Sequence, residues 1–281
     1  MMEIKNLNKF SSNDHVFVIC AYKENQYLKE CIRSLKEQSC KSNIIMVTST
    51  PNNYIQEQCN IFEIPLFINI NNTTNNMASN WNFAYQQMSN KRLLTIVHQD
   101  DIYEPDYLSQ ILKIANKVQN ALILYTDYYE MREKAEGFIK QYHNRLLNIK
   151  RIMNFPLLFS VLQRSKWIRR FFLSFGNPIC CPSVTYIKAN LPKSLFDTNF
   201  NACDYKAWAM ISKINGAFVY CPKRLVGHRI YKESTTSTTI ANNIRKKEDL
   251  EILSEFWPKS ITRIIYFFYK KAEKSNDGKS D

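Results

Sequence analysis

The stretch LLTIVHQDDIYEPDYL, residues Leu93–Leu108, decides the fold class, because an uncharged apolar run leads straight into two adjacent carboxylates. Leu93–Val97 has the composition of a buried strand, and Asp100 and Asp101 follow where the strand gives way to a loop. Ligands of open α/β sheets bind beyond the carboxyl ends of strands, and hard oxygen atoms there suit Mg²⁺ or Mn²⁺ carrying a polyphosphate. The alternative is that either carboxylate only caps the helix expected over residues 106–118.

Alternating strands and helices around this stretch predict an α/β fold. A buried strand at Val16–Ala21 is followed by a helical apolar face and by a second strand at Ile44–Thr48, which indicates a parallel pair. We therefore expect a Rossmann-like, doubly wound, mostly parallel central sheet. Further strands are expected at Leu66–Ile70, Ala121–Thr126, Pro182–Lys188 and Ala217–Cys221, and further helices over 77–88 and 204–214. In contrast, Arg132–Asn177 is charged, aromatic and irregular in pattern.

The composition predicts an anionic partner. The chain of 281 residues carries 38 lysines and arginines against 25 aspartates and glutamates, a formal charge of +13, so nucleic acid, anionic lipid and a nucleotide diphosphate are candidates. Five glycines exclude a P-loop or a dinucleotide fingerprint, and no zinc-finger spacing or RNP-type box is present. Because no apolar block precedes Val16 and no uncharged run could span a bilayer, we expect a cytoplasmic location.

Four short patterns follow one another along the chain: VFVICAYKEN (16–25), HQDD (98–101), CDYKAW (203–208) and GHRIYKESTT (227–236). Together they resemble the family 2 glycosyltransferases, which have the GT-A fold of the nucleotide-diphospho-sugar transferase superfamily. The resemblance implies a glycosyltransferase domain over 14–240 and a C-terminal helical extension with a polar tail over 241–281. Within the domain it implies a nucleotide-sugar-binding half (14–127), a basic aromatic insertion (128–178) and an acceptor and catalytic half (179–240).

The resemblance implies a nucleotide-sugar site at the first two strand ends. Ala21, Tyr22 and Glu24 match the segment that lines the base pocket in the family, although Tyr22 could also be an ordinary loop aromatic. After the second strand the family usually has an acidic turn, where this chain has Thr48 followed by Ser-Thr-Pro. Thr48 is a candidate contact to the nucleotide, and the base preference stays open.

HQDD matches the DxD motif of the family, with His98 in place of the first carboxylate and Asp100 in place of the metal-binding one. Mn²⁺ or Mg²⁺ at Asp100 would bridge the diphosphate and neutralise the leaving group. The resemblance places His98, Gln99, Asp100 and Asp101 in the nucleotide-sugar site. Whether His98 reaches the ribose, assists the metal or caps the loop is left open.

Asp204, at the head of a predicted helix, matches the carboxylate that serves as general base in the family. Direct displacement with inversion needs one base on the side of the acceptor hydroxyl opposite the leaving nucleotide. The alternative is that Asp204 only caps the helix, which aspartate does well.

GHRIYKESTT matches a loop that closes over the diphosphate in the family. The resemblance implies that Arg229 clamps the diphosphate, that His228 is a metal ligand and that Ser234 gives a hydroxyl to phosphate. Tyr231 stands where a second histidine is expected, which weakens the assignment of His228 to the metal. The alternative is that these charges are solvated and that the hydroxyls only form turns.

Two stretches combine basic and aromatic residues, Arg164–Phe175 and Lys259–Lys271. Apolar residues recur in both at helical spacing beside arginine and lysine, a pattern typical of helices that lie in an anionic interface. Core-packing helices with solvated basic faces explain the same pattern. A peripheral location on the inner face of the cell membrane is therefore one of two open interpretations.

The predicted function is that of an inverting, metal-dependent, hexosyltransferase-type glycosyltransferase. It would move a sugar from a nucleotide-diphosphate donor, with UDP preferred, to a glycan or lipid-linked glycan in bacterial surface polysaccharide synthesis. A catalytically inactive GT-A-like protein that binds glycan or nucleotide is the alternative, since the acidic turn and the second histidine are absent. Nucleic-acid binding would rest on charge alone and is not expected.

Overall fold

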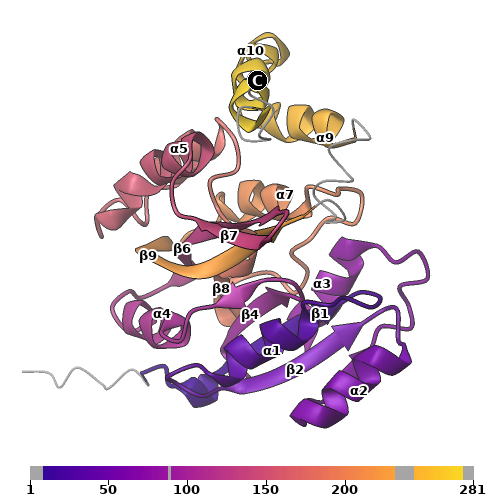
Figure 1. Ribbon diagram of the computed structural model, residues 1–281. Coiled ribbons are helices and arrows are strands. Elements are labelled where there is room, and N and C mark those ends of the chain that lie inside the picture. The colour runs from indigo at the N-terminus through magenta and orange to yellow at the C-terminus, as the bar shows by residue number, and fades with distance from the viewer. Residues whose placement is uncertain (1–8, 88–89, 232–243, 275–281) are drawn as a thin grey trace, which may run out of the picture.

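The computed structural model describes residues 9–87, 90–231 and 244–274, which form a sheet of nine strands with helices on both faces (Figure 1). The strand order is β3-β2-β1-β4-β8-β6-β9-β5, and β7 pairs with β6 outside this path. The strands are β1 (His15–Ala21), β2 (Asn43–Thr48), β3 (Leu66–Ile68), β4 (Leu93–His98), β5 (Ile102–Tyr103), β6 (Ala121–Lys134), β7 (Gly137–Gln141), β8 (Val184–Ile187) and β9 (Ala217–Ile230). The α/β class predicted from the sequence is confirmed.

The first half of the sheet is parallel, as predicted. β1 pairs with β2 on one side and with β4 on the other, and β3 extends the sheet beyond β2. The connections are helices, as parallel neighbours require. They are α1 (Leu28–Lys36), α2 (Asn53–Phe62) and α3 (Met77–Gln86), of which α2 was not predicted.

The second half of the sheet is mixed and corrects two predictions. β8 runs antiparallel to both β4 and β6, whereas β6 and β9 are parallel. β6 and β9 have 14 residues each, so both continue well beyond the predicted Thr126 and Cys221. Residues 132–177 are therefore not irregular, because β6 extends to Lys134 and turns into β7, and two helices follow.

Alternate residues of the central strands pack on opposite faces of the sheet, as the period of a strand requires. Val16 and Val18 of β1 belong to a core that α3 and α7 (Cys203–Ile211) cover. Phe17 and Ile19 belong to a second core, beneath α1, α2 and α4 (Tyr107–Ala115). The sheet is thus covered on both faces, which leaves its strand ends as the places where polar side chains can reach solvent.

The remaining helices lie at one end of the molecule, where Figure 1 shows α9 and α10 beyond α5 and α7. They are α5 (Arg145–Asn154), α6 (Lys166–Leu173), α9 (Ile244–Leu253) and α10 (Lys259–Lys274). Ile252 and Leu253 of α9 and Tyr266 of α10 join the core around α7, so the C-terminal helices are anchored on the domain. Among the described residues, no helix is long and apolar enough to cross a membrane. The predicted division of the domain into halves stays a prediction.

Candidate active site

Three parallel strands end side by side and bring the predicted nucleotide-sugar residues together. Ala21 at the end of β1 pairs with Thr48 of β2, and Cys20 pairs with His98 of β4. The Gln99 side chain bridges the neighbouring chain segments, since its Oε1 accepts from Tyr22 N at 2.9 Å and its Nε2 donates to Tyr22 O at 2.9 Å. The segments that follow β1 and β4 are therefore tied together at the carboxyl edge of the parallel half.

The turn after β2 fixes the segment that follows β1. Thr48 is buried, and its Oγ1 accepts from Thr50 N at 3.0 Å, while Thr50 Oγ1 accepts from Lys23 N at 2.7 Å. These bonds hold Lys23 in the left-handed region, at a φ of 54°. Thr48 thus shapes the turn with a buried side chain, whereas Tyr22 and Glu24 are exposed beside it.

Asp101 is a fully buried carboxylate that ties the end of β4 to the end of β9. Its Oδ1 lies 3.0 Å from His228 Nδ1 and accepts from Arg229 N at 2.9 Å. Its Oδ2 has no hydrogen-bond partner among the described residues and lies 3.6 Å from His98 Nδ1. The capping alternative is wrong for both Asp100 and Asp101, because α4 begins only at Tyr107.

Asp100 lies beside this anchor with a different set of contacts. Its Oδ2 accepts a hydrogen bond from the hydroxyl of Tyr231 at 2.9 Å, and its backbone oxygen accepts from Arg229 Nε at 2.8 Å. His98 stacks on the indole of Trp81 at 4.9 Å, and its buried Nε2 has no hydrogen-bond partner among the described residues. The site therefore contains the carboxylate of Asp100, the phenol of Tyr231 that binds it, and one unpaired imidazole nitrogen of His98.

The pKa values of the two carboxylates are shifted in opposite directions. Burial and the neighbouring Asp101 raise the pKa of Asp100. Burial opposes ionisation of Asp101 as well, but the charge and hydrogen bond of His228 outweigh it and lower the pKa of Asp101. Asp101 in turn raises the pKa of His228 against the effect of burial, whereas burial lowers the pKa of His98. Asp100 is thus the carboxylate whose negative charge has the least compensation.

Arg229 is buried in the fold and is not a free surface charge. Its side chain is 2 % exposed, and its Nη2 donates to Glu30 Oε2 at 2.7 Å in addition to the bond to Asp100 O. The guanidinium lies 4.1 Å from the ring centre of Tyr27 and 4.5 Å from that of Phe138. His228 and Arg229 belong to strand β9, so the predicted loop begins later than expected. In this arrangement Arg229 holds the Asp100 backbone, and its predicted contact to diphosphate would compete with these bonds.

Asp204 is the second residue of α7 and does not cap it. The N-cap position is Ala202, and Asp204 Oδ2 instead accepts from Asn177 Nδ2 at 2.8 Å. The capping alternative for Asp204 is therefore wrong. Burial lowers the pKa of His98, and the charge of Asp204 opposes this effect, so Asp204 lies within electrostatic range of the HQDD segment.

The head of α7 is held by the C-terminal extension. Glu248 of α9 is buried, and its carboxylate accepts from the backbone N–H groups of Asn201 and Ala202 at 2.9 and 2.7 Å. It also accepts from Asn201 Nδ2 at 2.8 Å. A carboxylate at the amino end of a helix satisfies unpaired N–H groups and the helix dipole. α9 therefore positions the turn that carries Asp204.

The side chains of this site suit a divalent cation that takes some of its ligands from the substrate. Among the described residues, no three His, Cys, Asp or Glu side chains form a ready-made metal cluster. Mg²⁺ is commonly held by one or two carboxylates plus substrate phosphates, and Asp100 with the unpaired Nε2 of His98 fits such an incomplete shell. His228 already contacts Asp101 through Nδ1. Ser234, predicted to contact phosphate, lies outside the described residues.

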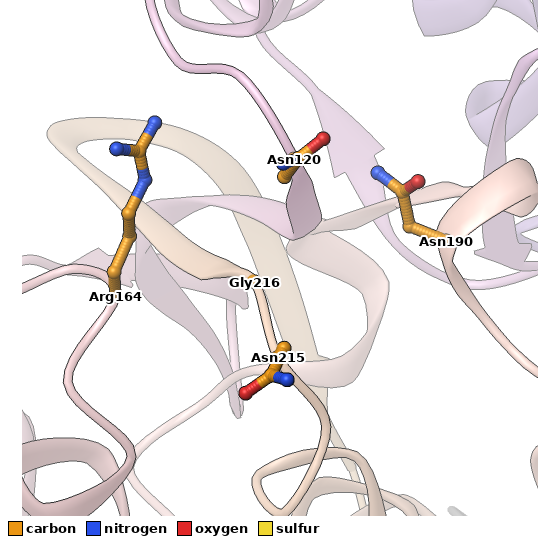
Figure 2. A pocket seen from close by; sticks show the side chains of 5 residues that line it. All are labelled: Asn120, Arg164, Asn190, Asn215 and Gly216. Atoms are coloured by element: carbon orange, nitrogen blue, oxygen red, sulfur yellow. The ribbon is translucent and has the colours of Figure 1, made fainter.

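A polar pocket of about 360 Å³ lies elsewhere, at the amino ends of β6 and β9 (Figure 2). Its lining residues are Asn120, Arg164, Asn190, Asn215 and Gly216. Because β6 runs in the same direction as β4, this pocket is at the edge of the sheet opposite the carboxyl ends of β1, β2 and β4. It does not belong to the site assembled by the HQDD segment.

Comparison with known proteins agrees with this geometry. The family model described as glycosyl transferase family 2 matches residues 16–176. An uncharacterized glycosyltransferase of Rickettsia prowazekii is 23% identical over 240 residues, which cover 83% of this chain and 69% of that protein.

Solved structures show the same fold at low sequence identity. A fragment of S. aureus TarS in complex with UDP-GlcNAc is 13% identical, with a TM-score of 0.56 over 93% of this chain and 73% of that one. The mannosyltransferase PcManGT from Pyrobaculum calidifontis, in complex with GDP-Man and Mn²⁺, is 13% identical, with a TM-score of 0.58 over 90% of this chain and 68% of that one. The fold is therefore GT-A.

Proposed function

The chain belongs to glycosyl transferase family 2, and on this premise we propose that it is an inverting glycosyltransferase. It would transfer a sugar from a nucleotide-diphosphate donor, with UDP as the preferred nucleotide, to a glycan or lipid-linked glycan acceptor in bacterial surface polysaccharide synthesis. The observation that carries the proposal is the joining of HQDD to the end of β9 through Asp101, which leaves Asp100 at the carboxyl edge of the sheet.

The donor and the metal are inferred from this edge and from the solved relatives. Those relatives were determined with UDP-GlcNAc and with GDP-Man and Mn²⁺. In this chain Asp100 would hold Mn²⁺ or Mg²⁺, with an imidazole of His98 or His228 beside it. A bound divalent cation neutralises the charge that develops on a departing diphosphate. Tyr22, Glu24 and Gln99 would face the nucleoside, because they follow the ends of β1 and β4.

The acceptor would be activated by Asp204. A carboxylate within hydrogen-bond reach of a sugar hydroxyl can take its proton as that oxygen attacks the anomeric carbon. Asn177 Nδ2 donates to one oxygen of Asp204, which orients the carboxyl group. Since the departing nucleotide lies on the opposite face of the sugar, a single base predicts inversion.

The test measures donor hydrolysis and transfer with and without the proposed metal ligand. Purified protein with Mn²⁺ should release UDP from UDP-sugars, and Asp100→Asn should remove nearly all of this activity and the Mn²⁺-dependent part of UDP affinity. Asp106→Asn is the matched control, because it removes an exposed carboxylate six residues away. Near-normal turnover of Asp100→Asn would show that the metal is bound elsewhere.

A protein that only binds nucleotide is the second candidate. Two observations favour it: Tyr231 occupies an oxygen of Asp100, and the guanidinium of Arg229 is committed to Glu30 and the Asp100 backbone. A thermal-shift screen over nucleotides and nucleotide sugars with and without Mn²⁺ separates the candidates when paired with the hydrolysis assay. Stabilisation by UDP and Mn²⁺ without hydrolysis or transfer of any donor would favour the binding protein.

A further inference from the structure

An exposed row of aromatic side chains runs along α6. Trp167 is 70% exposed, and it stacks on Phe171 with ring centres 5.3 Å apart. Phe175 continues the row at 5.1 Å from Phe171 and lies 6.0 Å from Trp257, the residue that precedes α10 by two positions. The spacing of four residues places Trp167 and Phe171 on one face of α6, and Phe175 extends the row from the turn that follows the helix. The opposite face carries the buried Arg169 and Leu173.

α10 continues this surface with a second apolar face. Its inner side packs Thr262 and Tyr266 against the domain. Ile261, Ile264 and Phe268 recur at intervals of three and four residues on the other side, and all three are exposed. A helix that only covered a core would be polar there, so the exposed face of α10 is apolar for another reason.

Exposed apolar residues from the last turn of α5 to the connection before α6 extend the surface, since α10 also contacts α5 (Figure 1). They are Ile152, Phe155, Leu158, Phe159 and Val161. The surface formed by α6, α10 and this connection is called the aromatic platform below.

Charge identifies what the aromatic platform contacts. Residues 137–196 contain ten lysines and arginines and no aspartate or glutamate, and residues 256–272 contain four and none. Arg164, which precedes α6, Lys166 at its first position, and Lys259 and Arg263 of α10 are exposed and lie close in sequence to the aromatic residues. Arg169 is an exception, because its guanidinium donates to three backbone carbonyls inside the fold. Glu273 near the end of α10 is the one carboxylate in the sequence of the two helices, and apolar wedges beside cations with so few carboxylates suit an anionic lipid surface.

We propose that the aromatic platform docks the protein on the surface of an anionic bilayer. Trp167, Phe267 and Phe268 enter the boundary between headgroups and acyl chains, and the surrounding cations face lipid phosphates. α9 links this platform to the catalytic half, since it precedes α10 and its Glu248 holds the head of α7. The docking thus presents the acceptor half to the membrane, where a lipid-linked glycan would lie.

The experiment is flotation of the full chain with vesicles, which requires neither donor nor turnover and so stands apart from the proposed activity. The expected result is recovery with vesicles of phosphatidylcholine and phosphatidylglycerol at low salt, little recovery with phosphatidylcholine alone, and loss as salt rises. Replacing Phe267 and Phe268 together by serine should lower the partition coefficient by about tenfold or more. Replacing Ile61 and Ile70, which are exposed on the opposite half of the chain, should leave it unchanged.

Three results would overturn the proposal: no recovery with anionic vesicles, equal recovery with both vesicle types, or equal losses in the two double variants. Light scattering without lipid tests the alternative that a second copy of the chain binds to the platform. A wild-type dimer that becomes monomeric with Phe267 and Phe268 replaced, while flotation is unchanged, would assign the platform to self-association. Far-UV circular dichroism and a cooperative thermal transition of each variant confirm that it has folded, without reference to nucleotide binding.

Discussion

Asp204→Asn is the substitution that separates a catalytic carboxylate from a structural one. The side chain has nearly the same shape, and its amide oxygen can still accept from Asn177 Nδ2. No capping bond is lost, because the N-cap of α7 is Ala202 and the bonds at the head of this helix come from Glu248. The variant therefore removes a charge and a proton acceptor while leaving the hydrogen-bonded framework in place.

The expected magnitudes follow from these contacts. Losing a negative charge in the first turn of α7 costs about 0.3–1 kcal/mol, and weakening the bond from Asn177 to a neutral one costs about 1 kcal/mol more. The free energy of unfolding should thus fall by no more than about 2 kcal/mol. Loss of a general base slows a reaction about 10²-fold or more, which raises the barrier by about 2.7 kcal/mol. Turnover should therefore fall much further than the folded fraction.

The assay combines UDP release in the presence of an acceptor with calorimetric titration of UDP and Mn²⁺. Turnover should fall at least about 10²-fold, whereas UDP affinity should be unchanged because the proposed role of Asp204 is to activate the acceptor. Glu251→Gln, an exposed carboxylate of α9, is the control for the loss of one charge. Normal turnover of Asp204→Asn once it is folded, or a loss of UDP affinity that accounts for the whole effect, would refute the assignment.

Two further substitutions test the donor side. Arg229→Lys should lower the free energy of unfolding by about 1–3 kcal/mol in urea titrations, since an ammonium cannot stack on Tyr27 and also hold the Asp100 carbonyl. Intact stability with weakened UDP binding would instead place Arg229 on the diphosphate. Tyr231→Phe removes the hydrogen bond to an oxygen of Asp100, so this variant should bind Mn²⁺ at least as tightly as Tyr142→Phe, the control at an exposed tyrosine. Calorimetry measures the Mn²⁺ affinity of both variants. Weaker Mn²⁺ binding would make the phenol part of the metal site.

The parallel half of the fold was predictable because local pattern and pairing agree there. Val16–Ala21, Ile44–Thr48 and Leu93–Val97 are short apolar runs, and their ends differ from the observed strands by one residue at most. The carboxylates after β4 were found for the same reason, since a buried strand that ends in Asp-Asp is unusual. α2 was not predicted, because its sequence NYIQEQCNIF mixes polar and apolar residues without a clear helical face.

The mixed half was predicted poorly because its strands depend on distant partners. β6 continues past Asp127 with charged residues, and only pairing with β9 and β7 makes this segment a strand. Arg229 shows the same limit at the level of one side chain. Its partner Glu30 is 199 positions away, and Phe138 belongs to a hairpin that the sequence pattern did not reveal. Charge alone favoured a surface role, whereas the fold buries the guanidinium between two rings.

The pair of adjacent aspartates shows how the fold distinguishes two identical side chains. Asp101 has a backbone N–H and an imidazole as partners, so its charge is compensated inside the protein and its pKa is lowered. Asp100 has a neutral phenol as its side-chain partner, and burial beside Asp101 raises its pKa. A cation at this edge would gain most from Asp100, because burial and the charge of Asp101 leave that carboxylate the less compensated of the two. The fold therefore gives the second aspartate of HQDD the anchoring role and leaves the first as the proposed metal ligand, and the position of these residues after β4 does not by itself predict this division.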